Sequence, residues 1–150
     1  MLKEGDKAPD IKLDTDTGEP FRLSKLKGKK VVLYFYPRAD TPGCTTETCE
    51  FRDMLPKFKS TKAVVLGASI LDEKSKAKFA AKYNVNFPLL ADADHAVAEK
   101  YGVWQEKMNY GKAYMGIVRT TYLIGPDGVV KQRWDKVKVE GHAEEVLKAD

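Results

Sequence analysis

A buried-strand pattern that leads directly into a helix start decides much of the fold. Residues 31–36 form a continuous β-branched and aromatic run, which is typical of a central strand covered on both faces. Pro37 ends this run. Thr41 is a good helix N-cap, Pro42 suits the first helical position, and helical composition follows over residues 44–58. The sequence therefore predicts a central strand whose carboxyl end leads into a helix.

Strand and helix patterns alternate along the whole chain. Further strands are predicted at residues 11–13, 21–23, 63–69, 89–90, 119–124 and 129–134, and further helices at residues 72–83, 96–101 and 142–148. Pro56 is expected to end or kink the helix that contains it. An Asp-Thr-Gly turn joins the first two strands and a Gly-Pro-Asp-Gly turn joins the last two, so both pairs read as hairpins. We expect one α/β domain over residues 1–150, with a mixed sheet, helices on both faces and an N-terminal β-hairpin.

Both cysteines of the chain lie on the helix that follows the central strand. Cys44 falls in its first turn, where unpaired amides and the helix dipole favour an anion such as a thiolate. Cys49 follows five residues later, so helix geometry puts the two Cα atoms about 8.5 Å apart. A disulfide needs Cα atoms within about 7 Å. If both are helical when reduced, at least the first turn must unwind before they can be joined.

Other side chains near the cysteines have less specific interpretations. Glu47 and Arg52 lie on the same predicted helix, where a solvated or salt-bridged role is the default and a tuning role stays open. The aromatic residues 34–36 are expected to be mostly core, with one ring available to line an entrance.

The segment Pro37-Arg-Ala-Asp-Thr-Pro-Gly-Cys44 resembles the Pro-x-x-x-Thr-x-x-Cys signature of peroxiredoxins. Cys49, at its spacing from Cys44, resembles the Q-type subgroup, also called bacterioferritin comigratory proteins. The resemblance continues in order and spacing through Gly-Asp-Lys-Ala-Pro-Asp at residues 5–10, Phe-Arg-Asp at 51–53, Phe-Pro-Leu-Leu-Ala-Asp at 87–92 and Arg-Thr-Thr-Tyr-Leu-Ile-Gly-Pro-Asp-Gly at 119–128. It covers nearly the whole chain and implies a thioredoxin-like fold.

The resemblance also implies roles for individual residues. Cys44 matches the peroxidatic cysteine, which attacks a peroxide and becomes a sulfenic acid, and Cys49 matches the resolving cysteine, which condenses with it to a disulfide. Thr41 matches the threonine that positions the peroxide, and Pro37 the proline that shields the site from water. Arg119 matches the arginine that holds the thiolate and polarises the O–O bond. These residue types suit the chemistry, because a fixed cation lowers the pKa of a thiol and preorganised donors stabilise the charge that develops on the departing oxygen.

Each of these residues also has a simpler interpretation. Two cysteines in a chain of this size can be buried and inert. Arg119 alone reads as a surface or salt-bridging arginine, Thr41 is sufficiently explained as a helix cap, and Pro37 as a strand terminator. His95 and His142 have no metal-site spacing, and the sequence has no Cys-x-x-Cys, so no metal is expected.

A looser apolar cluster precedes Arg119. It consists of Trp104, Met108, Tyr110, Tyr114 and Met115, with glycines between them. It fits a flap beside the pocket, a partner surface or ordinary packing, and packing is the favoured interpretation.

Composition limits the function classes. The net charge is +4, with acids and bases interleaved, and the basic stretch at residues 25–30 reads as a solvated loop without a nucleic-acid motif. The sequence has no membrane-spanning stretch or signal-peptide core, so a cytoplasmic location is expected. That compartment is reducing, which favours a catalytic or redox-sensing cysteine pair over a structural disulfide.

The sequence and the resemblance together predict a thiol-dependent peroxidase for hydrogen peroxide and alkyl hydroperoxides, without haem, flavin or metal. A thioredoxin-like dithiol reductant would regenerate it, and the resemblance implies a monomer. The second candidate is a protein disulfide oxidoreductase, which would need a Cys-x-x-Cys motif. The third is a binding or holdase protein with incidental cysteines.

Overall fold

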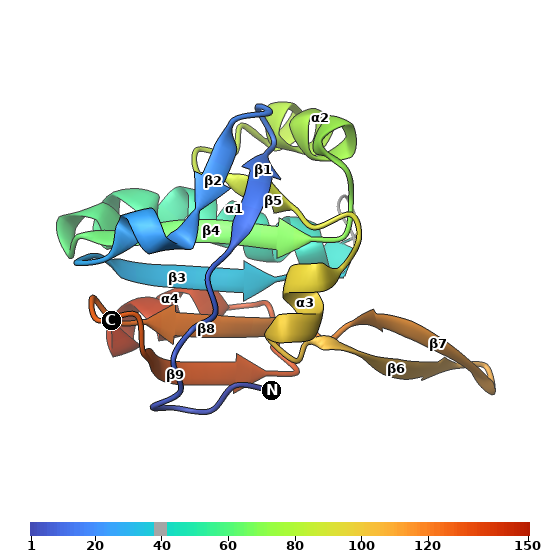
Figure 1. Cartoon of the computed structure of the whole chain (residues 1–150). Coiled ribbons are helices and arrows are strands. Elements are labelled where there is room, and N and C mark those ends of the chain that lie inside the picture. Colours follow the sequence, from blue (N-terminus) through green and yellow to red (C-terminus); the bar gives the residue numbers. More distant parts are fainter. Residues whose placement is uncertain (38–41) are drawn as a thin grey trace.

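The computed structural model describes residues 1–37 and 42–150, apart from the side chains of Glu73 and Asn109. Its centre is a seven-stranded mixed sheet with the strand order β2-β1-β5-β4-β3-β8-β9 (Figure 1). The strands are β1 (Lys12–Thr15), β2 (Pro20–Arg22), β3 (Lys30–Phe35), β4 (Ala63–Ser69), β5 (Leu89–Ala91), β8 (Thr120–Ile124) and β9 (Val130–Asp135). β3 pairs in parallel with β4 and antiparallel with β8, so the predicted mixed sheet is confirmed.

Helices cover both faces of this sheet. The helices are α1 (Pro42–Ser60), α2 (Glu73–Tyr83), α3 (Ala96–Lys100), α4 (His142–Ala149) and the 3-10 helix η1 (Leu23–Leu26). One core cluster joins α1, α2 and α4 to the sheet, and the other joins α3 and η1 to the opposite face. Figure 1 shows α1 and α4 behind the sheet and α3 in front of it. Successive side chains of β3 alternate between the two clusters, which explains its unbroken apolar sequence.

The N-terminal hairpin is confirmed and is part of the main sheet. β1 pairs antiparallel with β2, as the turn between them predicts. β1 also pairs with β5 through Asp14 and Ala91, so the hairpin extends the sheet at one edge.

Of the two alternatives expected for Pro56, an end of the helix is wrong, because α1 continues to Ser60, and a kink stays a prediction. A proline inside a helix removes the N–H that would bond the carbonyl four residues earlier, here that of Arg52. Asn86 Nδ2 donates to this carbonyl at 3.3 Å and replaces the lost bond. The side chain of a distant residue thus makes the proline tolerable.

Of the apolar cluster before Arg119, Trp104 packs against the core and the other four residues are exposed, so ordinary packing is wrong for those four. The cluster forms a separate antiparallel hairpin of β6 (Trp104–Asn109) and β7 (Lys112–Ile117), which projects from the body of the molecule (Figure 1). Tyr110 at its tip is 98% exposed, and Met108, Tyr114 and Met115 are also exposed. Only Trp104 is partly covered, with its ring stacked on His95 at 4.2 Å between centroids.

None of the helices in the described part of the chain combines the length and apolar character that crossing a bilayer requires.

Candidate active site

The site lies where the carboxyl end of β3 meets the beginning of β8. The antiparallel register pairs Phe35 with Thr120, so the residue before β8, Arg119, lies beside the end of β3. α1 begins at Pro42, as predicted, and carries Cys44 in its first turn. The sheet register and the helix start therefore bring Arg119 and Cys44 together from 75 residues apart.

Arg119 bridges the sulfur of Cys44 and the carboxylate of Glu47. Its Nη2 donates to Cys44 Sγ at 3.1 Å, and its Nη1 donates to Glu47 Oε1 at 2.8 Å. Cys44 is fully buried, and the Arg119 side chain is 16% exposed. The planar guanidinium holds both partners at once, which a lysine cannot do in the same way. A permanent cation is therefore fixed against the thiol.

Gly43 makes room for this contact. A Cβ at this position would lie 3.2 Å from Arg119 Nη2, which is closer than ordinary van der Waals contact. The glycine before Cys44 thus lets the guanidinium approach the first turn of α1.

Glu47 is an acid in an unfavourable environment. Its side chain is 1% exposed, and Oε2 has no hydrogen-bond partner among residues 1–37 and 42–150. Burial raises the pKa of Glu47 to about 7, although Arg119 opposes this shift. Burial also acts against the charge of Arg119, but Glu47 and the neighbouring sulfur raise the pKa of Arg119 overall. Near neutral pH the number of negative charges beside Arg119 therefore depends on pH.

Two tyrosines from the β3 segment form the base beneath α1. The Tyr34 ring stacks on Phe51 at 4.8 Å between centroids, and its hydroxyl bonds to Thr48 Oγ1 at 2.9 Å. Gly67 on β4 accommodates this ring, because a Cβ there would lie 2.8 Å from it. Phe35 and Tyr36 are also fully buried, so the three rings of residues 34–36 belong to the core, as mostly expected.

Tyr36 contacts a buried lysine. Lys76 of α2 has no exposed surface, and its Nζ bonds to Tyr36 Oη at 3.2 Å and to Ser69 Oγ. The amine also lies 4.9 Å from the centre of the Tyr36 ring. Burial lowers the pKa of Lys76 to about 7, against the opposing effects of Asp92, Asp16 and Asp72.

The second cysteine is on the same helix but is not joined to the first. Both are free thiols, with Cys44 buried and Cys49 half-buried. With both inside α1, their Cα atoms are roughly 8.5 Å apart. This exceeds the span of about 7 Å that a disulfide tolerates. The helix must open before Cys49 can reach Cys44.

The structure brings together some of the predicted site residues and leaves others apart. Cys44 and Arg119 are in contact, and Cys49 is further along α1. Pro37 directly follows the buried Tyr36 and is half-buried, while Thr41 lies outside the described residues.

Lys76 was not predicted as part of this region, whereas Glu47 was expected to be solvated or salt-bridged, with a role in tuning the site left open; the structure shows it salt-bridged to Arg119. Glu47 carried one usable signal, because residues three apart on a helix share a face, so it lies on the side of Cys44. Lys76 carried none, since it is one of several lysines on α2. Among the described residues, no group of three or more His, Cys, Asp or Glu side chains could hold a metal ion.

Known proteins match this chain over almost its full length. The AhpC/TSA family profile matches residues 4–133. The chain belongs to the AhpC/TSA family. It is 51% identical over 146 residues to a putative peroxiredoxin Bcp of Coxiella burnetii, covering 97% of each chain. It is 49% identical over 146 residues to the peroxiredoxin Bcp of Bacillus subtilis, covering 97% of this chain and 93% of the relative.

Solved structures agree with this assignment. The bacterioferritin comigratory protein of Xanthomonas campestris superimposes with a TM-score of 0.89 at 43% identity, covering 93% of this chain and 88% of that one. The expected thioredoxin-like fold is confirmed, and the chain is a Q-type peroxiredoxin of the AhpC/TSA family. It is therefore a thiol-dependent peroxidase.

Proposed function

We propose that this peroxiredoxin reduces hydrogen peroxide and alkyl hydroperoxides, with Cys44 as the peroxidatic cysteine. The observation that carries the proposal is the contact of 3.1 Å between Arg119 Nη2 and the sulfur of Cys44, which is buried in the first turn of α1. The related Xanthomonas protein is described by its alkyl peroxide reduction activity, which supports the choice of substrate class.

In the first step the Cys44 thiolate attacks the terminal oxygen of the peroxide. A new S–O bond forms, the O–O bond breaks, and the sulfur is oxidised to a sulfenic acid. The departing oxygen leaves as an alcohol, or as water from hydrogen peroxide, after taking up a proton. The guanidinium of Arg119 stabilises negative charge on the sulfur and on the departing oxygen. Thr41 positions the peroxide and Pro37 limits the access of water, as their places in the signature imply.

In the second step Cys49 resolves the sulfenic acid. Its thiol attacks the sulfur of Cys44, an S–S bond forms, and the hydroxyl of the sulfenic acid leaves as water. Because helical Cα atoms five residues apart are too distant for this bond, the first turns of α1 unwind. A thioredoxin-like dithiol then reduces the disulfide, and the helix re-forms.

We also propose that the chain works as one domain and as a monomer in the cytoplasm. Cys44 and Cys49 lie on one helix, so the catalytic cycle needs no second subunit. A reducing compartment would keep both as the free thiols seen here.

The test is a thiol count and an intact mass of the reduced protein before and after one equivalent of hydrogen peroxide. We expect loss of two thiols and of about 2 Da without dimer formation, as an internal disulfide requires. Cys44→Ser should keep its remaining thiol, and Cys49→Ser should stop at a sulfenic or sulfinic acid. Thiols that persist in the wild-type protein would refute the proposed role of Cys44.

A further inference from the structure

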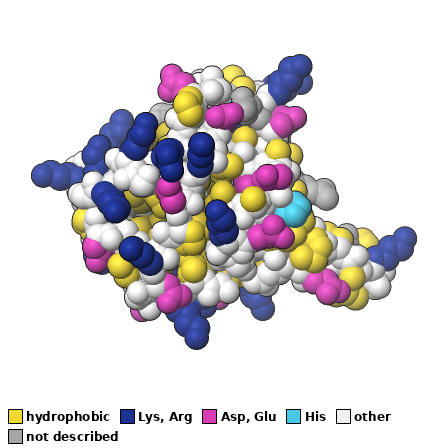
Figure 2. Space-filling model, in the orientation of Figure 1, with side chains coloured by type: hydrophobic (Ala, Val, Ile, Leu, Met, Phe, Trp, Pro, Cys, Tyr) yellow, Lys and Arg dark blue, Asp and Glu magenta, His cyan; other side chains and the backbone are white. Residues whose placement is uncertain are grey.

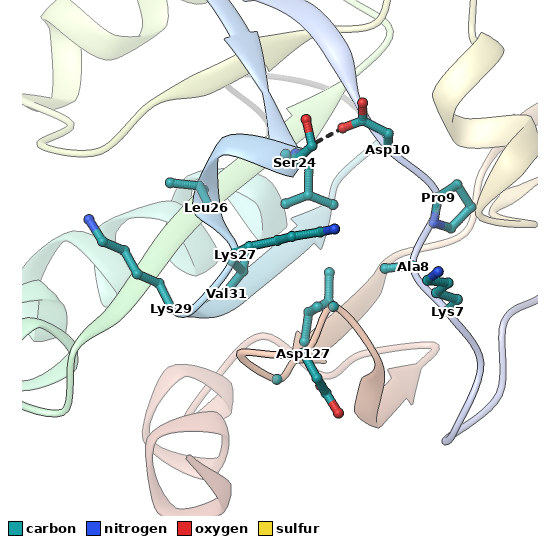
Figure 3. A pocket seen from close by; sticks show the side chains of 14 residues that line it. Lys7, Ala8, Pro9, Asp10, Ser24, Leu26, Lys27, Lys29, Val31 and Asp127 are labelled. Atoms are coloured by element: carbon teal, nitrogen blue, oxygen red, sulfur yellow. Dashed lines mark hydrogen bonds between the residues drawn. The ribbon is translucent and has the colours of Figure 1, made fainter.

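A cavity of about 340 Å³ lies at the opposite edge of the sheet from Cys44. It is found where β3 begins, between the N-terminal segment, η1 and the turn that joins β8 to β9 (Figure 3). Its apolar lining consists of Ala8, Pro9, Leu23, Leu26, Val31 and Ile124. Val31 and Ile124 are buried core residues, so the cavity reaches the hydrophobic interior.

Backbone hydrogen bonds hold the three walls of the cavity in place. Ala8 N donates to Gly128 O, and Gly28 N donates to Pro126 O, both at 2.9 Å. Ser24 N donates to Asp10 Oδ1 at 2.9 Å, which closes the third side (Figure 3). The cavity is therefore formed before any ligand arrives, as small-molecule sites usually are.

The charged groups around the cavity are mainly cationic. Lys7, Lys27 and Lys29 line it and are exposed, and within the described part of the chain no carboxylate pairs with their ammonium groups. Lys27 extends across the opening towards Ala8, whereas Lys29 points away (Figure 3). Figure 2 shows Lys and Arg side chains gathered with apolar atoms on this side of the molecule.

The two carboxylates in the lining do not cancel this charge. Asp10 pairs with Arg22 at 3.2 Å and accepts hydrogen bonds from the amides of Ile11 and Ser24. Asp127 Oδ1 accepts from Val129 N at 3.1 Å, and Figure 3 shows this side chain turned away from Lys27. Lys27 and Lys7 are thus the charges available to a ligand.

We propose that this cavity binds a small amphipathic carboxylate, with its apolar body against the lining and its carboxylate at Lys27 and Lys7. The apolar lining selects the body and the cationic opening selects the sign of the charge. The site is separate from the peroxide site, because Cys44 follows the other end of β3. It does not depend on the proposed catalytic roles.

The probe is octanoate, added to isotope-labelled reduced protein while amide NMR spectra are recorded. We expect saturable shifts at the amides of Gly28, Val31 and Gly128, and no saturable shift at Cys49. Octanol, which has the same chain without the charge, should bind more weakly.

Variants separate the contributions of charge and volume. Lys27→Met should weaken octanoate binding about two- to fivefold, as expected for loss of one exposed ion pair, and Lys7→Met with Lys27→Met should weaken it further. The methyl group of Ala8 faces the cavity in Figure 3, so Ala8→Leu should fill the space and abolish binding. Lys78→Met, an exposed lysine on α2, is the matched control and should bind octanoate like the wild type.

Three results would overturn the proposal. They are the absence of saturable shifts at the cavity amides, equal binding of octanol and octanoate, and unchanged octanoate binding in the double lysine variant. Peroxide turnover should be unchanged in Lys27→Met, and this separates failure of the cavity site from failure of the proposed peroxidase mechanism.

Discussion

Two buried ionisable groups pack on the same face of the sheet, and their partners differ. Glu47 on α1 has an arginine at 2.8 Å, whereas the direct contacts of the Lys76 amine among the described residues are the hydroxyls of Tyr36 and Ser69 and the Tyr36 ring. Glu47 shares its partner with the reactive sulfur, while Lys76 supports the segment that leads into the site. The ion pair of Glu47 and Arg119 therefore sets the charge beside the Cys44 sulfur. The buried amine of Lys76, whose direct contacts are neutral groups, mainly affects the stability of the fold.

The two groups also make stability depend on pH in opposite directions. Glu47 has a raised folded-state pKa, so the folded state binds more protons than the unfolded state between about pH 4.5 and 7, and stability falls as pH rises through this range. Lys76 has a lowered pKa, so the unfolded state binds more protons between about pH 7 and 10.5, and stability rises with pH there. The combined contribution of Glu47 and Lys76 to the free energy of unfolding is therefore lowest near pH 7.

Lys76→Met should give the largest effect. It removes a buried charge that is paired with no carboxylate in the described part of the chain, so it should stabilise the protein below pH 7, with the gain disappearing towards pH 10.5. The upper limit is about 5 kcal/mol, from a pKa lowered from 10.5 to about 7 at about 1.4 kcal/mol for each pH unit. Urea unfolding across this pH range measures it, with Lys78→Met as the control. A constant difference at every pH would mean that the pKa of Lys76 is the same in the folded and unfolded states.

Arg119→Met should have the next largest effect, on the reaction itself. Removing one preorganised donor costs about a hundred- to a thousandfold in rate, or about 3–4 kcal/mol. Stopped-flow measurement of peroxide consumption at neutral pH tests this expectation.

A pH series adds a second readout for the same variant. The loss should shrink as pH rises, because part of the role of Arg119 is to hold the thiolate. Arg119→Lys should retain more activity than Arg119→Met. An unchanged rate in Arg119→Met would remove this residue from the site.

Glu47→Gln tests the other side of the ion pair. It keeps the shape of the side chain and removes the charge, so the fall in stability between pH 4.5 and 7 should disappear. The expected difference is at most about 3 kcal/mol, from a pKa raised from 4.5 to about 7. Thermal or urea unfolding of both proteins measures it, and Glu144→Gln on the exposed face of α4 is the control. Parallel pH profiles for Glu47→Gln and wild type would contradict the assignment.

Gly43→Ala should have the smallest effect, with opposite signs for activity and stability. The added methyl group would lie 3.2 Å from Arg119 Nη2 and displace the guanidinium from the sulfur. We expect peroxide turnover to fall about tenfold or less, corresponding to about 1.4 kcal/mol. Stability should be equal or higher, because alanine favours a helix by up to about 1 kcal/mol over glycine. Parallel turnover and melting measurements check this, and full activity would show that Arg119 adjusts freely.

The centre of the sheet was predicted because β3 and β4 are almost continuously apolar. The predicted strand at residues 63–69 coincides with β4, and Asp72 caps α2 by accepting from Ser75 N at 2.8 Å, as expected. The β6–β7 hairpin was missed because its apolar side chains face solvent, so composition suggested a core where none exists.

The site could be predicted only in part. The position of Cys44 in the first turn of α1 was predicted from local features, because a helix start can be read from neighbouring residues. Arg119 is 75 residues away, and only the family resemblance linked it to the sulfur. The burial of Lys76 had no local signal, since its depth depends on how α2 packs over Tyr36.

The replacement of the bond lost at Pro56 has a consequence for the catalytic cycle. The Arg52 carbonyl accepts from Asn86, and the Arg52 guanidinium donates to Tyr83 O at 2.7 Å, so this turn of α1 is tied to the end of α2 and to the segment that follows it. Unwinding of α1 that starts at its first turn would include both cysteines. It would reach Arg52, which is held by these two hydrogen bonds, three residues after Cys49. Only a short length of helix must then melt and refold in each turnover. The two hydrogen bonds of Arg52 therefore limit how many residues gain conformational entropy on unwinding and lose it again on refolding. They also keep the unwound segment close to the position that Cys44 occupies in the helix.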